Sequence, residues 1–191
     1  MPLNLPNLIT WLRIVLIPLF VGIFYFETSW VSEPNQNLVA TVLFTAAAIT
    51  DWLDGWLARR LNQMSAFGAF LDPVADKLMV AAALITLVQL ERVDAIIALI
   101  IIGREIAISA LREWMAQLGQ TKSIAVAFIG KLKTVAQMTA IVALLLHEPV
   151  IPRVSTPLLG TVALWVAAIL TLWSMFHYLK LAAPHLHGHK H

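Results

Sequence analysis

The sequence predicts an all-α integral membrane protein, a bundle of six transmembrane helices with both termini in the cytoplasm. Composition is the first reason: 60% of the 191 residues are hydrophobic and only 13% are charged, about half the charged fraction of a soluble domain. The mean hydropathy of +0.81 agrees with this. A further reason is that apolar stretches long enough to cross a bilayer, about 20 residues each, recur along the chain.

Each apolar stretch is interpreted as one spanning helix. The predicted helices cover about 8–26, 38–60, 69–90, 93–116, 126–147 and 157–181. The connections between them are short and carry turn and capping residues, as in SEPNQN (32–37). The sequence shows no internal repeat. We therefore expect one membrane domain, residues 1–182, followed by a tail at 183–191.

The placement of Lys and Arg predicts the orientation of the bundle. With six spans the two termini share one side of the membrane, and ten of the thirteen basic residues fall at or near that side. Arg92 and Arg153 fall on the other side, and Arg104 lies within the fourth span. Basic residues favour the cytoplasmic side. Both termini and the connection 58–68 should therefore be cytoplasmic.

Composition also excludes some classes of function. The net charge is +2 and the basic residues are dispersed, so no nucleic-acid-binding patch is expected. The chain has no cysteine, which excludes disulfide and thiolate chemistry. The terminal segment HLHGHKH (185–191) alternates histidine with other residues. We interpret it as a flexible solvated tail, with metal binding as the alternative.

Four of the eleven acidic residues fall within one 26-residue window, on the second and third predicted helices. Their spacing places Asp51 and Asp54 on one helix face, and Asp72 and Asp76 on one face of the next helix. A short connection joins these helices, so they should pack antiparallel. The four carboxylates can then meet near the cytoplasmic boundary.

Ionised aspartates inside a membrane are costly and need partners. Four hard oxygen donors suit Mg²⁺ or Mn²⁺, and two such ions could clamp a diphosphate for displacement at phosphorus. Gly55 and Ala58 lack bulk on the same face, and Arg59 could bind phosphate oxygens. The alternative is a buried ion-pair network, with Arg59, Arg60 and Lys77, that only holds the two helices together.

Residues 51–76, DWLDGWLARRLNQMSAFGAFLDPVAD, resemble the signature of the CDP-alcohol phosphotransferase family. They read Asp-x2-Asp-Gly-x2-Ala-Arg-x8-Gly-x3-Asp-x3-Asp, with every defining position filled. The resemblance implies transfer of a phosphatidyl-type group from a CDP-linked donor to an alcohol, with release of CMP. The implied metal ligands are Asp51, Asp54, Asp72 and Asp76, and Asp76 is also the candidate base. The implied lining of the CDP pocket is Gly55, Ala58, Arg59 and Gly68.

Three further stretches resemble one branch of this family, the phosphatidylglycerophosphate synthases. They are LNLPNLITWLRI (3–14), GREIAISALREWMAQLG (103–119) and GKLKTVAQMTAI (130–141). This resemblance implies CDP-diacylglycerol as donor, sn-glycerol 3-phosphate as acceptor and a homodimer in the bacterial cytoplasmic (inner) membrane. An anionic acceptor needs cations, and the candidates are Arg104, Arg112, Lys131 and Lys133. Asn7, Thr10 and Arg13 match the opening pattern of this branch. Asn7 is assigned to the donor pocket and Thr10 to the acceptor site, but Thr10 could instead cap the first helix and Arg13 could simply snorkel.

Several alternatives remain open at this stage. Each of Arg112, Lys131 and Lys133 could be an ordinary cytoplasmic anchor, and Glu105 or Glu113 could pair with Arg104. The enzyme could be a family member that uses serine or inositol. A membrane prenyltransferase also binds Mg²⁺ through aspartate-rich motifs, although with different spacing. A transporter would need an aqueous path through the bundle.

Overall fold

The computed structural model describes residues 5–61, 66–117, 127–149 and 155–186. Over these residues the chain forms six α-helices and one short 3-10 helix, and it contains no strand. The elements are α1 (Leu5–Gly22), η1 (Ile23–Tyr25), α2 (Glu33–Leu61), α3 (Ala66–Gln89), α4 (Ala95–Gln117), α5 (Ala127–Leu146) and α6 (Thr156–Leu186). The all-α prediction is confirmed, and each predicted helix coincides with one observed helix.

Two helices extend well beyond one of their predicted ends. Helix α2 begins at Glu33 instead of residue 38, because the Ser32 carbonyl accepts hydrogen bonds from the backbone amides of Asn35 and Gln36. Pro34 fits in this first turn, where a helix needs no N–H donor. Helix α6 continues to Leu186 and so includes the first residues of the predicted tail. The remaining tail, 187–191, lies outside the described residues.

Short, well-capped connections join the helices at the end opposite the termini. Glu91 follows α3 with a φ of 58° and His147 follows α5 with a φ of 57°, the left-handed conformation that commonly ends helices. The Asp94 carboxylate then accepts a hydrogen bond from the Ile96 amide at 2.7 Å and caps the start of α4. The caps at Glu91 and Asp94 let the chain reverse direction between α3 and α4 within a few residues.

Arg92 ties three elements together at this end. Its Nη1 donates to the carbonyls of Leu144 and Leu145 at 3.2 and 3.0 Å, where α5 ends and its carbonyls lack helical partners. Its Nη2 contacts Glu33 at 3.2 Å, at the start of α2. The guanidinium therefore joins the α3–α4 turn to both α5 and α2.

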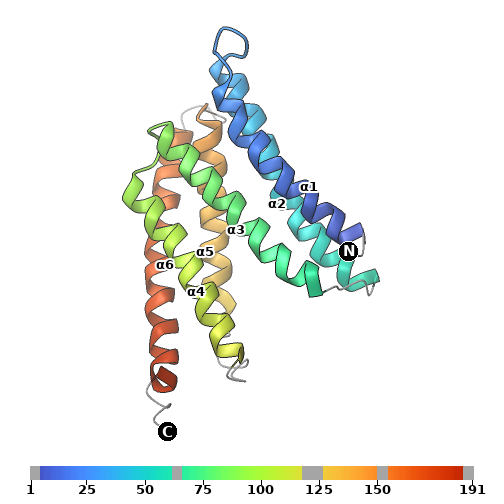
Figure 1. The fold of residues 1–191 in the computed structure, drawn as a ribbon. Coiled ribbons are helices and arrows are strands. Elements are labelled where there is room, and N and C mark those ends of the chain that lie inside the picture. The colour runs from blue at the N-terminus through green and yellow to red at the C-terminus, as the bar shows by residue number, and fades with distance from the viewer. Residues whose placement is uncertain (1–4, 62–65, 118–126, 150–154, 187–191) are drawn as a thin grey trace.

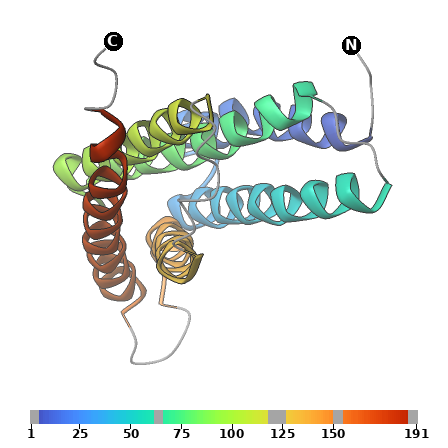
Figure 2. The same cartoon turned by 90° about the horizontal axis from the view of Figure 1, so that it is seen from below.

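The helices form two groups, with α3 between them (Figure 1). Helices α1 and α2 run side by side, and α5 packs extensively against α6. Helix α3 contacts α1, α2, α4 and α5. Seen from below, α1, α2 and α3 incline away from the α5–α6 pair (Figure 2). In Figure 1 the C-terminal end of α6 lies at the bottom, whereas the start of α1 lies at about mid-height on the right.

A continuous apolar core runs through the bundle, while other large apolar side chains cover its outside. The core includes Phe20, Phe44, Leu84 and Ile141, all 0–1% exposed. Outside, Leu99 is 70% exposed. Apolar side chains on the outside of a bundle suit a lipid environment. Within the described residues, two stretches are apolar and long enough to cross a membrane, Leu8–Tyr25 and Thr156–His177. The six-span topology stays a prediction.

The α5–α6 contact depends on a glycine, which allows a stability test. A Cβ at the buried Gly160 would lie 2.7 Å from Leu144 Cγ and 3.2 Å from Ala143 Cβ. We expect Gly160→Ala to lower the free energy of unfolding by about 1–3 kcal/mol through overpacking, measured by denaturant-induced unfolding in detergent micelles. The matched control is Gly103→Ala on α4, where no atom lies within 4 Å. Equal stability of the two variants would contradict this account of the contact.

Candidate active site

The polar end of the bundle is organised by α1, which places a cation against the aspartate of α2. Arg13 Nη1 lies 2.5 Å from Asp51 Oδ1. The Arg13 side chain is 1% exposed, whereas that of Asp51 is 41% exposed. A guanidinium buried to this degree requires an anionic partner. The ion pair therefore fixes the position of α1 against α2.

One turn earlier, α1 makes a second polar contact, to α3. Thr10 Oγ1 donates to Asp72 Oδ1 at 2.6 Å, and Thr10 is 1% exposed. Thr10 and Arg13 are three residues apart and so lie on one face of α1. This face holds one carboxylate of α2 and one of α3 at the same time.

The Asp76 carboxyl group completes this region. Asp51, Asp76 and Arg13 line one small cavity, together with apolar residues of α2, α3 and α5. Asp72 lies one turn before Asp76 on α3, on the same face. The charged residues whose fields reach the Asp76 carboxyl group are Asp51, Glu105, Arg13 and Lys77. The structure thus places Asp51 and Asp76 at one cavity, with Asp72 one turn before Asp76 on α3.

These carboxylates suit a divalent cation in donor type. Hard oxygen ligands are what Mg²⁺ and Mn²⁺ prefer, and contacts such as those of Thr10 and Arg13 are typical of the outer shell of metal sites. Among the side chains that the structure describes, no three acidic or histidine groups lie close enough together to hold an ion. The fourth predicted ligand, Asp54, has its side chain outside the described part of the chain.

Most of the predicted donor pocket also lies outside that description. This applies to the side chains of Asn7, Gly55, Ala58 and Arg59. Gly68 is described: it is buried on α3, one turn before Asp72. Its assignment to the donor pocket stays a prediction.

Two of the four predicted acceptor cations, Arg104 and Lys133, meet between α4, α5 and α6. Lys133 Nζ contacts Glu105 Oε1, and Arg104 Nη1 lies 3.5 Å from the same oxygen. Arg104 Nη2 also donates to Ser174 Oγ at 2.6 Å. Arg104 and Lys133 are therefore brought together around one carboxylate. The pairing of Arg104 with Glu105, an alternative that the sequence leaves open, is present.

Other predicted residues take different positions. The side chains of Arg112 and Lys131 lie outside the described residues. Thr10 contacts Asp72, so the structure places its hydroxyl beside a signature aspartate and not beside Arg104 or Lys133. Lys77 Nζ donates to Ser109 Oγ and joins α3 to α4.

Two residues of this region were not among the predicted site residues, Arg13 and Glu105. Both carry charge within predicted apolar spans, which is the signal that could have identified them. Arg13 allows the simpler interpretation of a snorkelling side chain, since it lies near the start of its helix. Only the structure shows that it points inward and is buried.

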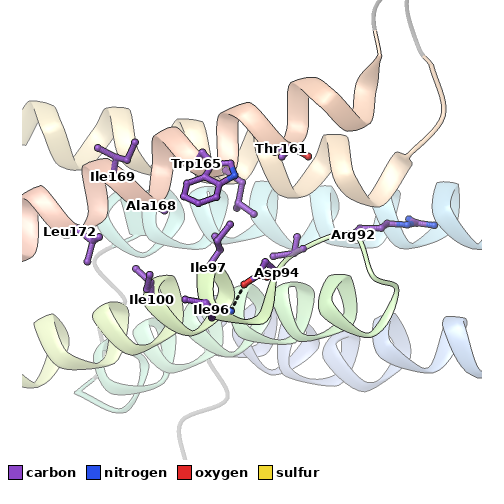
Figure 3. Close-up of a pocket in the computed structure, with 12 residues that line it drawn as sticks. Arg92, Asp94, Ile96, Ile97, Ile100, Thr161, Trp165, Ala168, Ile169 and Leu172 are labelled. Atoms are coloured by element: carbon purple, nitrogen blue, oxygen red, sulfur yellow. Dashed lines mark hydrogen bonds between the residues drawn. The ribbon is translucent and has the colours of Figure 1, made fainter.

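A separate cavity of about 420 Å³ lies between α4 and α6. Its lining is mostly apolar, with Trp165 and Ala168 of α6 facing Ile97 and Ile100 of α4 (Figure 3). The charged residues at this cavity bind helix ends. Asp94 caps the start of α4, and Arg92 donates to the last carbonyls of α5. The chemistry therefore belongs to the carboxylate region.

Comparison with known proteins identifies the family of the chain. Residues 3–173 match the family model described as CDP-alcohol phosphatidyltransferase. A Pseudomonas fluorescens protein named CDP-diacylglycerol--glycerol-3-phosphate 3-phosphatidyltransferase is 52% identical over 96% of this chain and 92% of its own length. Proteins of the same name from Escherichia coli K12 and from Shigella flexneri serotype 5b are each 47% identical over 97% of this chain and 98% of theirs. The matched region includes every predicted site residue, so the chain belongs to the CDP-alcohol phosphatidyltransferase family.

Proposed function

We propose that this chain transfers the phosphatidyl group of CDP-diacylglycerol to sn-glycerol 3-phosphate, giving phosphatidylglycerophosphate and CMP. The observation that carries the proposal is the 47–52% identity, over nearly the whole chain, to proteins named for that reaction. The site geometry supports it, because Asp51 and Asp76 of the signature line one cavity, and two of the cations predicted for an anionic acceptor, Arg104 and Lys133, meet at Glu105.

Divalent metal use is general in this family. Here the residues that would hold the metal are the four signature aspartates, Asp51, Asp54, Asp72 and Asp76, and we propose two Mg²⁺ or Mn²⁺ ions. When bound, such ions draw negative charge from the diphosphate and stabilise the displacement at phosphorus. Thr10 and Arg13 orient two of the ligands, Asp72 and Asp51.

The protein side chains then supply positioning and proton transfer. Arg104 and Lys133 hold the phosphate of the acceptor, which places its primary hydroxyl beside Asp76. The Asp76 carboxylate accepts the hydroxyl proton as the oxygen attacks the phosphorus nearer the diacylglycerol. A new phosphorus–oxygen bond forms, the bond to the CMP oxygen breaks, and CMP leaves with that electron pair.

The membrane arrangement belongs to the same proposal. The six helices would cross the bacterial inner membrane, with the site at the cytoplasmic side, where most of the basic residues fall. The acyl chains of the donor would stay in the lipid while its head group reaches the aspartates. The exposed apolar side chains of α1 and α6 support a lipid contact. We also propose a homodimer, as the family resemblance implies.

The first prediction tests the reaction itself. Purified protein in detergent, given CDP-diacylglycerol, labelled glycerol 3-phosphate and Mg²⁺, should release CMP and form lipid-soluble label in equal amounts. A chelator should stop both, because the aspartates then lack the cation that engages the diphosphate. CMP release with serine or inositol instead would keep the family and change the acceptor. Absence of CMP with every acceptor would refute the proposal.

The second prediction concerns the proton acceptor. Asp76→Asn removes the carboxylate that takes the hydroxyl proton and also a proposed metal ligand, so turnover should fall by at least about 10³-fold. The measurement is the initial rate of CMP release at saturating substrates. The matched control is Asp94→Asn, the same chemical change at the opposite end of the bundle, where asparagine caps a helix equally well. A near-normal rate for Asp76→Asn would show that another group is the base.

The third prediction concerns the hydroxyl that orients Asp72. Thr10→Val keeps the branched shape and removes the donor, so the affinity for metal should fall about 10–100-fold, as for other outer-shell changes. Binding of Mn²⁺ to the protein without substrates, followed by electron paramagnetic resonance, measures this directly. Thr161→Val is the control, because that hydroxyl bonds only locally to the Pro157 carbonyl on the exposed side of α6. Equal Mn²⁺ affinity in both variants would count against the role of Thr10.

A further inference from the structure

The cavity of about 420 Å³ between α4 and α6 has no part in the proposed reaction. Its inner wall is buried, since Ala168 of α6 is 4% exposed and Ile97 of α4 is 7% exposed. Its rim is open, since Trp165, Ile96 and Ile169 are 54%, 68% and 61% exposed. The cavity therefore opens on the outside of the bundle, and its volume lies in the range of small-molecule sites, about 300–1,000 Å³.

The lining of this cavity changes from polar to apolar along its length. Arg92, Asp94 and Thr161 belong to one end, and the other end is apolar as far as Leu172 (Figure 3). Along α6 the lining runs from Thr161 to Leu172, which is about 16 Å at a rise of 1.5 Å per residue. One leaflet contributes about 15 Å to the hydrocarbon core of a bilayer. The cavity therefore has the length of a lipid chain in one leaflet.

The polar end of the cavity lies far from the signature aspartates. Helix α3 separates the two regions, because Asp76 is about 20 Å along the helix axis from Gln89, the last residue of α3. Arg92 and Asp94 follow in the α3–α4 turn, at the other end of α3 from its connection to α2 (Figure 1). In the membrane arrangement proposed above, this end reaches the leaflet opposite the active site. The acyl chains of the CDP-linked donor, which enter beside the aspartates, are therefore not expected in this cavity.

The charge at the polar end suits a phosphate group. Arg92 donates from Nη1 to two carbonyls of α5 and from Nη2 to Glu33. A guanidinium has five N–H donors, and these contacts within the described part of the chain use three of them. The Glu33 side chain is 66% exposed, so the guanidinium lies close to the surface at this end of the bundle. A lipid phosphate beside Arg92 would accept a charge-assisted hydrogen bond.

We propose that the cavity between α4 and α6 binds one acyl chain of a membrane phospholipid from the leaflet opposite the active site, with the lipid phosphate at Arg92. The proposal rests on the membrane arrangement given under the proposed function and goes beyond the reaction. An apolar lining offers no hydrogen bonds to a polar ligand, whereas a hydrocarbon chain fills the space and gains dispersion contacts with both helices. The bound lipid should therefore stabilise the packing of α4 against α6.

The test is photo-cross-linking of the delipidated wild-type protein in detergent. The probe is phosphatidylethanolamine, which is neither substrate nor product of the proposed reaction, with a diazirine midway along one acyl chain. We expect saturable cross-links in the peptides that cover 96–100 and 161–172, located by mass spectrometry. Unlabelled phosphatidylethanolamine should compete, and diacylglycerol with the same chains should compete about tenfold less well, because it lacks the phosphate. This comparison uses wild type alone and does not depend on the folding of a variant.

A matched pair of variants tests the cavity itself. Ile100→Trp places an indole in the cavity from α4, and Leu99→Trp adds an indole to the neighbouring residue, which is 70% exposed and is not part of the lining. Cross-linking should fall about tenfold in Ile100→Trp and stay at the wild-type level in Leu99→Trp. Phosphatidylethanolamine at about a hundred times its Kd should raise the melting temperature of wild type and Leu99→Trp by roughly 5 °C or more, and that of Ile100→Trp much less.

Three results would overturn the proposal. Cross-links spread evenly over the exposed apolar faces would show annular lipid only. Displacement of the probe by CDP-diacylglycerol would assign the cavity to the donor. Competition by diacylglycerol equal to that of phosphatidylethanolamine would remove the phosphate from Arg92.

The cross-linking readout also separates this proposal from the proposed reaction. If wild type gives saturable cross-links in the cavity but no CMP release with glycerol 3-phosphate, the proposed reaction fails and the lipid site stands. If wild type is active and Ile100→Trp cross-links as strongly as wild type, the lipid site alone fails.

Discussion

The structure depends on one constraint, the pairing of charge inside an apolar bundle, and the Arg13–Asp51 ion pair is its clearest case. Arg13 is 1% exposed and reaches from α1 to α2. Removing either partner of a buried pair leaves an uncompensated charge, which costs far more than the pair itself contributes. Helix α1 is otherwise apolar and could pack at many rotations about its axis. The need to bring Arg13 to an aspartate selects one of them, and that same rotation brings Thr10 to Asp72.

At both ends of the bundle the buried cations are paired, but the kind of partner differs. Arg92 donates to the last carbonyls of α5 and contacts Glu33. Two of those three acceptors are backbone atoms that every α-helix leaves without helical partners, so this arrangement serves the fold. At the opposite end the partners are side-chain carboxylates, Asp51 and Glu105, from residues that the fold alone does not require. Charge placed there at a cost to stability indicates a functional site.

The helices could be predicted from the sequence because a bilayer imposes a minimum length on apolar stretches. The aspartates could be placed on shared faces because helical spacing is regular. Contacts between helices could not be predicted, since they depend on how each helix is rotated in the bundle. Thr10 is an example: its match to a pattern suggested the acceptor side, and the structure puts its hydroxyl on Asp72. The start of α2 was also missed, because the turn-forming residues after Ser32 suit a first helical turn equally well.

Paired charges also explain why such a site can exist before its ligands arrive. Several carboxylates gathered in an apolar bundle repel one another. Arg13 and Thr10 offset part of that repulsion, while each contacts a single oxygen, Oδ1, of its aspartate. On the other side, the negative charge of Glu105 offsets the repulsion between Arg104 and Lys133, the two cations proposed for the acceptor. In both halves of the site a residue of the chain supplies the charge or hydrogen bond that keeps the binding groups oriented, so less reorganisation is needed when the ligand binds.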